Sequence, residues 1–150
     1  MAVAILVAGC GKNGATPVAQ ATITAWQEGD TATAVSNFVA ADWSARPLFA
    51  SDSALSLTAD QVRLFSDADS KRKAKELGLQ LDLLKKLAAG ITQAGTNSAA
   101  HGDFAQARKY FMSLGQFGAA MNDPRNVKLV QMVGVTIKRS ADAELAKIGQ

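Results

Sequence analysis

Apolar side chains recur with helical spacing along most of the chain. The clearest case lies in the middle, where Leu77, Leu81, Leu84, Ala88 and Ile91 follow one another at steps of four, three, four and three residues. These steps place all five side chains on one face of an α-helix. The pattern predicts a long helix over about residues 70–94.

Other helices follow from the same spacing and from residues that typically begin helices. Thr58 and Gln61 form a capping box, which predicts the start of a short helix that ends near Ser66. Asp123 followed by Pro124 is typical of a cap with proline at the first helical position. Together these signals predict an all-α domain of five to six helices, over about residues 17–28, 30–41, 58–66, 70–94, 103–121 and 124–148.

Residues 42–57 interrupt the helical pattern with Pro47 and several serines, which predicts a loop. Trp43 and Phe49 are the large apolar side chains of this loop, and we expect both to be buried in the core. The alternative is an exposed recognition patch that also contains Arg46, since Trp and Arg are common anchors of protein interfaces.

One ten-residue pattern occurs twice, because residues 29–38 and 102–111 both read G-D-x-A-x-A-x-x-x-F. Glycine ends a helix by adopting a left-handed conformation without a steric penalty. The aspartate then accepts hydrogen bonds from the free amides of the next helix, and Ala and Phe four residues apart share one face of it. The pattern predicts two helix-turn-helix hinges, formed by Gly29, Asp30, Ala34 and Phe38 and by Gly102, Asp103, Ala107 and Phe111.

This pattern resembles the tetratricopeptide repeat, whose second helix opens with Gly-Asp and an aromatic residue and continues with Ala and Phe at this spacing. The later copy also matches with Phe104, with Leu114 in the next apolar position and with Gly95 at the small position of the preceding helix. The resemblance implies helical hairpins packed as an irregular tetratricopeptide-like bundle, with a groove that binds a peptide or protein. Both copies lack the Trp-x-x-Leu-Gly start of the family, and an ordinary helical hairpin with the same turn chemistry is the alternative.

The N-terminus contains an unbroken apolar run over residues 2–8, followed by Gly9 and by the single cysteine of the chain, Cys10. A short apolar segment followed by small residues is typical of export, because a signal peptidase accepts only small side chains beside the bond that it cleaves. Residues 6–10, Leu-Val-Ala-Gly-Cys, resemble the lipobox of bacterial lipoproteins. The resemblance implies that the Cys10 thiol carries a diacylglycerol, that the chain is cleaved before Cys10, and that the new N-terminus is acylated.

We therefore expect a signal peptide over residues 1–9, a lipidated tether over residues 10–16 and a helical domain over residues 17–150. Signal peptides usually open with Lys or Arg, whereas the apolar run follows Met1 directly, so we expect the true start to lie upstream. Gly11 stands where the family's sorting rule associates Asp with inner-membrane retention. The resemblance thus implies the periplasmic side of the outer membrane in a Gram-negative host.

The same segment also fits the dinucleotide-binding pattern G-x-G-x-x-G, through Gly9, Gly11 and Gly14. This alternative would make the protein a nucleotide-binding enzyme, but it requires alternating strands and helices, and only residues 18–26 could supply one more strand. A phosphate-binding P-loop is excluded because Leu6 and Asn13 stand where a glycine and a Ser or Thr are required. A third possibility is a soluble cytoplasmic helical adaptor whose N-terminus is an additional apolar turn.

Composition limits the remaining chemistry. The 150 residues include 29 alanines, six Phe, two Trp and one Tyr, a composition typical of closely packed helices. One cysteine and one histidine exclude an internal disulfide and a zinc site built from several Cys and His. The histidine, His101, has no catalytic motif near it, and we expect it to be capping or solvated. Asp67 and Asp69 open like a calcium loop, but Lys71 and Arg72 replace its next ligand and its glycine.

The net charge of +3 is divided unevenly, with −3 on residues 1–60 and +6 on the remainder. The densest basic run, over residues 71–75, has no aromatic residues and has acidic neighbours, which favours a solvated helix face over a nucleic-acid site. We expect no catalysis, cofactor or metal. The sequence indicates a lipid-anchored cell-envelope protein, attached to the membrane through Cys10, that acts as an interaction or scaffolding module for an unidentified envelope protein or peptide.

Overall fold

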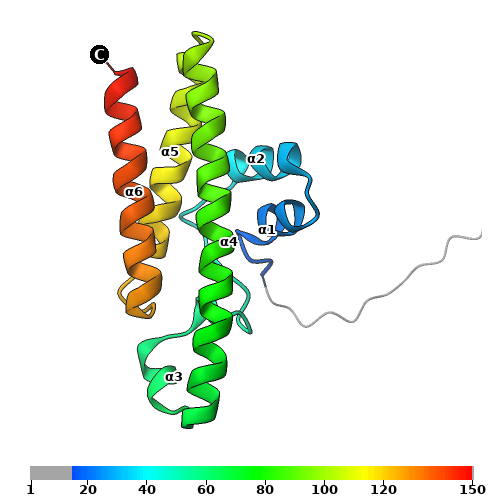
Figure 1. Cartoon of the computed structure of the whole chain (residues 1–150), viewed down its shortest axis with the longest axis vertical. Coiled ribbons are helices and arrows are strands. Elements are labelled where there is room, and N and C mark those ends of the chain that lie inside the picture. The colour runs from blue at the N-terminus through cyan, green and yellow to red at the C-terminus, as the bar shows by residue number, and fades with distance from the viewer. Residues whose placement is uncertain (1–14, 150) are drawn as a thin grey trace, which may run out of the picture.

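Residues 15–149 are described by the computed structural model, and all of their helices pack into one assembly. Three long helices lie side by side with alternating direction, and two shorter ones cross near the middle of the longest (Figure 1). The elements are α1 (Gln20–Gln27), α2 (Thr31–Ala40), a 3₁₀ turn (Ala54–Ser56), α3 (Ala59–Arg63), α4 (Asp67–Ala100), α5 (Phe104–Met121) and α6 (Lys128–Ile148). The predicted all-α fold class is confirmed, since this part of the chain contains six α-helices and no strand.

Both predicted hinges are confirmed, and they have the same backbone geometry. Gly29 and Gly102 each have a φ of +81°, the left-handed conformation that glycine adopts most readily. The next residue then caps the following helix: the Asp30 carboxylate accepts from the Thr33 amide at 3.1 Å, and the Asp103 carboxylate accepts from the Gln106 amide at 3.0 Å. The hinges join α1 to α2 and α4 to α5.

The longest helix, α4, exceeds its predicted range of 70–94 at both ends. It begins at Asp67 because the Ser66 hydroxyl accepts from the Asp69 amide at 3.2 Å. At its C-terminal end, the polar sequence after Ala94 stays helical up to the hinge. The Asp103 amide closes that hinge on the Ser98 carbonyl at 2.9 Å. The prediction missed residues 95–100 because they contain no large apolar side chain that would continue the pattern.

The predicted start of the last helix at Pro124 is wrong, and α6 begins at Lys128. The Asp123 carboxylate does not cap the helix but accepts from the Arg125 amide at 2.9 Å and from its guanidinium at 2.6 and 3.0 Å. The Val127 amide then donates to the Leu57 carbonyl at 3.3 Å, which ties the connection to the segment before α3. The predicted capping box of Thr58 and Gln61 at the start of α3 is confirmed.

The core joins the long helices to the segments that precede them. Four aromatic rings meet there, and Trp43 and Phe49 are buried, as predicted; ring centroids lie 4.7 Å apart for Phe38 and Trp43 and also for Trp43 and Phe117. The Trp43 indole donates to the Ser113 hydroxyl at 3.0 Å and to the Phe38 carbonyl at 3.1 Å, and this hydroxyl donates to the same carbonyl at 2.9 Å. The predicted loop is therefore fixed between α2 and α5.

Glycines allow two close approaches between helices. A Cβ atom added at Gly118 of α5 would lie 2.6 Å from the carbonyl oxygen of Gly134 in α6, and one added at Gly134 would lie 2.6 Å from the carbonyl oxygen of Gly118. In α4, a Cβ atom added at Gly95 would lie 2.6 Å from the Phe111 ring, so the small position predicted before the second hinge receives that ring. A Cβ atom at Gly90 would lie 2.7 Å from the Trp26 ring, where α1 crosses α4.

Candidate functional site

The residues on which the functional predictions depend most lie outside the described part of the chain. Cys10 and the glycines of the dinucleotide pattern, Gly9, Gly11 and Gly14, belong to residues 1–14. The same holds for the predicted signal peptide and for most of the predicted tether. The lipobox and its alternative therefore stay predictions.

Backbone hydrogen bonds join the segment before α1 to the loop after α2. The Val18 amide donates to the Pro47 carbonyl at 3.0 Å, and the Ala19 amide donates to the Leu48 carbonyl at 3.1 Å. These bonds fix the start of the domain against the loop that contains Trp43. Residues 18–26, which the dinucleotide alternative needs as a strand, lie mostly in helix α1.

The eight hinge residues serve the fold. Ala34, Phe38, Ala107 and Phe111 are all buried, so the repeated pattern places its apolar members in the core. Figure 1 shows the α1–α2 turn at the side of the molecule and the α4–α5 turn at one end, so the structure does not bring the two hinges together. His101 is exposed beside the second hinge, with its Nδ1 atom 2.7 Å from the Asn97 carbonyl oxygen, which agrees with the capping or solvated role expected for it.

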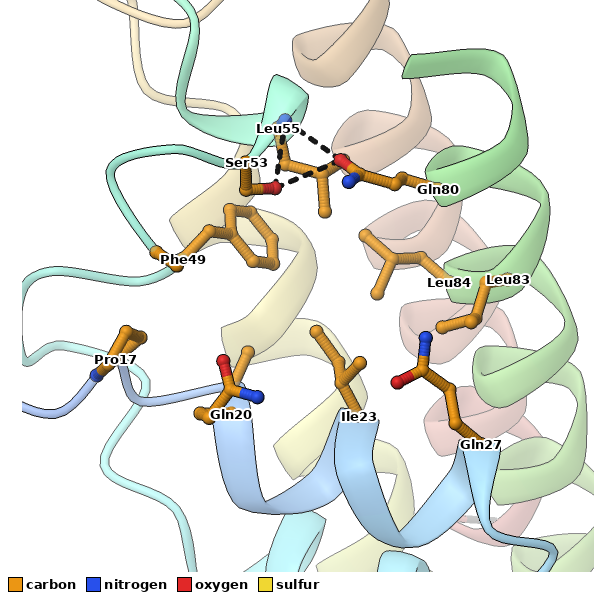
Figure 2. A pocket seen from close by; sticks show the side chains of 12 residues that line it. Pro17, Gln20, Ile23, Gln27, Phe49, Ser53, Leu55, Gln80, Leu83 and Leu84 are labelled. Atoms are coloured by element: carbon orange, nitrogen blue, oxygen red, sulfur yellow. Dashed lines mark hydrogen bonds between the residues drawn. The ribbon is translucent and has the colours of Figure 1, made fainter. Parts of the chain in front are cut away.

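A pocket of about 160 Å³ lies between α1, the loop after α2 and α4, and it is the site that the sequence did not indicate. Figure 2 shows Phe49, Ile23 and Leu84 converging on it from three separate segments. At one edge the Gln80 carbonyl oxygen accepts from the Ser53 hydroxyl at 2.9 Å and from the Leu55 amide at 3.2 Å (Figure 2). These bonds hold the 3₁₀ turn against α4.

The lining of this pocket is uncharged and combines apolar side chains with four polar ones, Gln20, Gln27, Ser53 and Gln80. Pro17, Ala19, Gln20, Ile23, Gln27, Phe49, Ala50, Ser53, Leu55, Gln80, Leu83 and Leu84 line it, and none of these side chains is ionisable at neutral pH. The pocket therefore offers no general acid, general base or nucleophilic thiol. It suits the binding of an uncharged group, and its apolar walls can accept an alkyl chain.

Several ionised groups elsewhere form local structural bonds. Two guanidinium bonds from Arg125 and its backbone amide hold the pKa of Asp123 at about 2, below the ordinary 3.8. The Thr33 side chain and amide likewise lower the pKa of the Asp30 carboxyl at the first hinge. Arg46, which the alternative placed in a recognition patch, donates to the Ala45 carbonyl at 2.9 Å and to the Trp43 carbonyl at 3.2 Å, and so fixes the loop.

Within 15–149, no three His, Cys, Asp or Glu side chains come together as a group that could hold a metal ion. In that range no helix combines the length and apolarity needed to cross a bilayer.

Comparison of the chain with family models, with curated proteins and with solved structures gives no match.

Proposed function

We propose that this chain is a lipid-anchored protein of the cell envelope whose helical domain acts as an interaction module without catalysis. The observation that carries the proposal is the position of Cys10, which ends the lipobox-like residues 6–10 and stands seven residues before Pro17. The first backbone bonds that fix the domain follow directly, at Val18 and Ala19. The order of apolar run, cysteine, short tether and packed domain is the order expected of a lipoprotein.

Lipid on Cys10 would supply the membrane attachment. Each buried methylene contributes about 0.8 kcal/mol, so several acyl chains anchor a protein where a single chain binds reversibly. A flexible tether of seven residues spans roughly 15 Å, which keeps the domain near the membrane surface.

Exposed apolar side chains near α3 support the interaction role. Leu64 is 86% exposed. Val62 of α3, Phe65 just after it and Leu129 of α6 contribute to an apolar pocket of about 160 Å³ between α3, α4 and the start of α6. Clustered apolar surface of this kind is typical of a site that another molecule covers.

Metabolic labelling with an alkyne-bearing fatty acid tests the anchor. We expect the wild-type protein to take up the label and to fractionate with membranes, and we expect Cys10→Ser to lose both properties. An unlabelled wild-type protein that fractionates like Cys10→Ser would contradict the proposal and favour the cytoplasmic adaptor.

Site-directed crosslinking in cells tests the interaction role. A photoreactive residue at position 64 should give a discrete protein adduct that disappears with Cys10→Ser, because the partner is expected in the envelope. The control position is Asp82, which is exposed on α4. Identical adducts from both positions would contradict a specific interface at α3.

A further inference from the structure

The pocket beside α1 lies where the predicted tether enters the domain. Pro17 forms part of its rim, and Figure 2 shows this ring on the side where the chain approaches α1. The bonds from Val18 and Ala19 to the loop fix Pro17 in this position. Any group attached a few residues before Pro17 is therefore tethered next to the pocket.

The uncharged lining has apolar walls that can accept an alkyl group. Ile23, Phe49 and Leu84 form apolar walls. The polar part of the lining consists of the Gln20 and Gln27 side chains and of Ser53 and Gln80, which are bonded to each other. No lining side chain carries a positive charge that could form an ion pair with a carboxylate or a phosphate. The volume of about 160 Å³ is close to that of an apolar cavity of about 150 Å³ known to hold benzene, which corresponds to about six carbon atoms.

We propose that this pocket holds the end of one acyl chain of the lipid on Cys10. The inference rests on the proposed function, because it requires that lipid. Pro17 lies seven positions after Cys10, and seven residue steps span at most about 24 Å when extended, so an acyl chain on Cys10 reaches the pocket. A tethered ligand has an effective concentration in the millimolar range, so even a weak site becomes occupied.

Methyl NMR tests the pocket with 1-octanol as a neutral alkyl probe. Full-length protein carrying Cys10→Ser and ¹³C-labelled isoleucine methyl groups is titrated with the alcohol. We expect a saturable shift of the Ile23 resonance with a millimolar Kd, because Ile23 lines the pocket. The Ile137 resonance should stay unchanged, because Ile137 is buried on α6, outside the pocket lining.

The lipidated wild-type protein provides the second arm. Its Ile23 resonance should already be displaced and should not respond to 1-octanol, since its own acyl chain occupies the pocket. An Ile23 shift with 1-octanol as large as in Cys10→Ser would overturn the inference. A displaced and unresponsive Ile23 in Cys10→Ser would also overturn it, because the occupant would then be the apolar residues 2–8.

Two substitutions on one face of α4 provide matched variants. Leu83→Trp fills the pocket and should raise the Kd for 1-octanol about tenfold. Leu79→Trp places the same side chain one turn away, where Leu79 is 65% exposed, and should leave the Kd unchanged. Ala50→Leu reduces the volume of the pocket from the loop after α2. This variant keeps the test valid if Leu83→Trp disturbs α4. Equal affinities in all variants would overturn the proposed site.

Mass spectrometry separates the two proposals. Wild-type protein without lipid on Cys10 would contradict the proposed function itself. Lipidated protein whose Ile23 responds like that of Cys10→Ser would retain the anchor and remove only the acyl pocket.

Discussion

Replacing Gly118 with alanine perturbs the closest approach of α5 and α6. The added Cβ atom would lie 2.6 Å from the Gly134 carbonyl oxygen and 2.6 Å from the Lys138 amide nitrogen. Both neighbours are backbone atoms, so no change of side-chain rotamer relieves the contact. The two helices have to move apart along part of their interface.

Two opposing effects set the size of the expected change. Glycine in a helix interior is about 1 kcal/mol less favourable than alanine, so the substitution alone would stabilise α5. Overpacking of a close contact costs about 1–3 kcal/mol, occasionally more. Because the contacts at Gly118 are with backbone, we expect the steric cost to exceed the helical gain, with a net loss of about 1–2 kcal/mol. For a chain of this length, this loss corresponds to a decrease in Tm of about 2–8 °C.

The matched control is Gly115→Ala, one turn earlier on the same helix. Its Cβ atom would lie 3.8 Å from a carboxylate oxygen of Asp142 and 3.9 Å from the Ala141 Cβ atom, which are ordinary contacts. We expect this variant to be about 0.5–1 kcal/mol more stable than the wild type. Urea denaturation followed by circular dichroism measures both variants. A Gly118→Ala protein as stable as Gly115→Ala would refute the close packing of these helices.

Three further substitutions test the hinge, the core and the ion pair. Asp103→Ala removes the cap of α5 and should lower the free energy of unfolding by about 1 kcal/mol, whereas Asp103→Asn should change it by a few tenths; equal thermal shifts would contradict a capping role. Ser113→Ala removes the buried hydroxyl that donates to the Phe38 carbonyl and should cost about 1 kcal/mol in urea denaturation, and an unchanged midpoint would contradict it. Arg125 holds the pKa of Asp123 at about 2, below the ordinary 3.8. The stabilisation by this carboxylate is therefore present above about pH 4 and is lost as the pH falls towards 2. The stability advantage of the wild type over Asp123→Asn should shrink over this range, and a constant difference between pH 2 and pH 7 would contradict the pairing.

The hinges were predictable because their chemistry is local. A left-handed glycine and an aspartate cap need only their nearest neighbours in sequence, so Gly102 and Asp103 could be assigned from the sequence alone. The same reason explains the success at Thr58 and Gln61, whose two side chains complete the capping box between themselves.

The start of α6 and the crossing of α5 and α6 depend on contacts that are not local. Asp123 has the residue type of a cap, but the guanidinium of Arg125 takes its carboxylate. Gly118 and Gly134 appear in the sequence as weak helix formers. Only the packing of α5 against α6 shows that a side chain at either position would contact the backbone of the other helix.

The pocket escaped prediction because its walls come from segments far apart in the sequence. Ile23, Phe49 and Leu84 each appear as ordinary core residues of their own segment. Gln80 is the one local signal, since it lies three residues after Leu77 and four before Leu84 on a largely apolar helix face. Its polar side chain there indicates a bonded partner from another segment, which the structure shows to be Ser53.

The short helix α3 divides the polypeptide into two unequal parts that are held together by packing. None of its residues is buried, and the Arg63 side chain is 79% exposed. Trp43, which precedes α3 in the sequence, donates a hydrogen bond to Ser113, which follows α3, at 3.0 Å. A chain cut by trypsin after Arg63 should therefore stay assembled as a nicked complex. The domain can thus be divided after Arg63 into two fragments. Expressed separately, the fragments should associate, so that each can be detected through its assembly with the other.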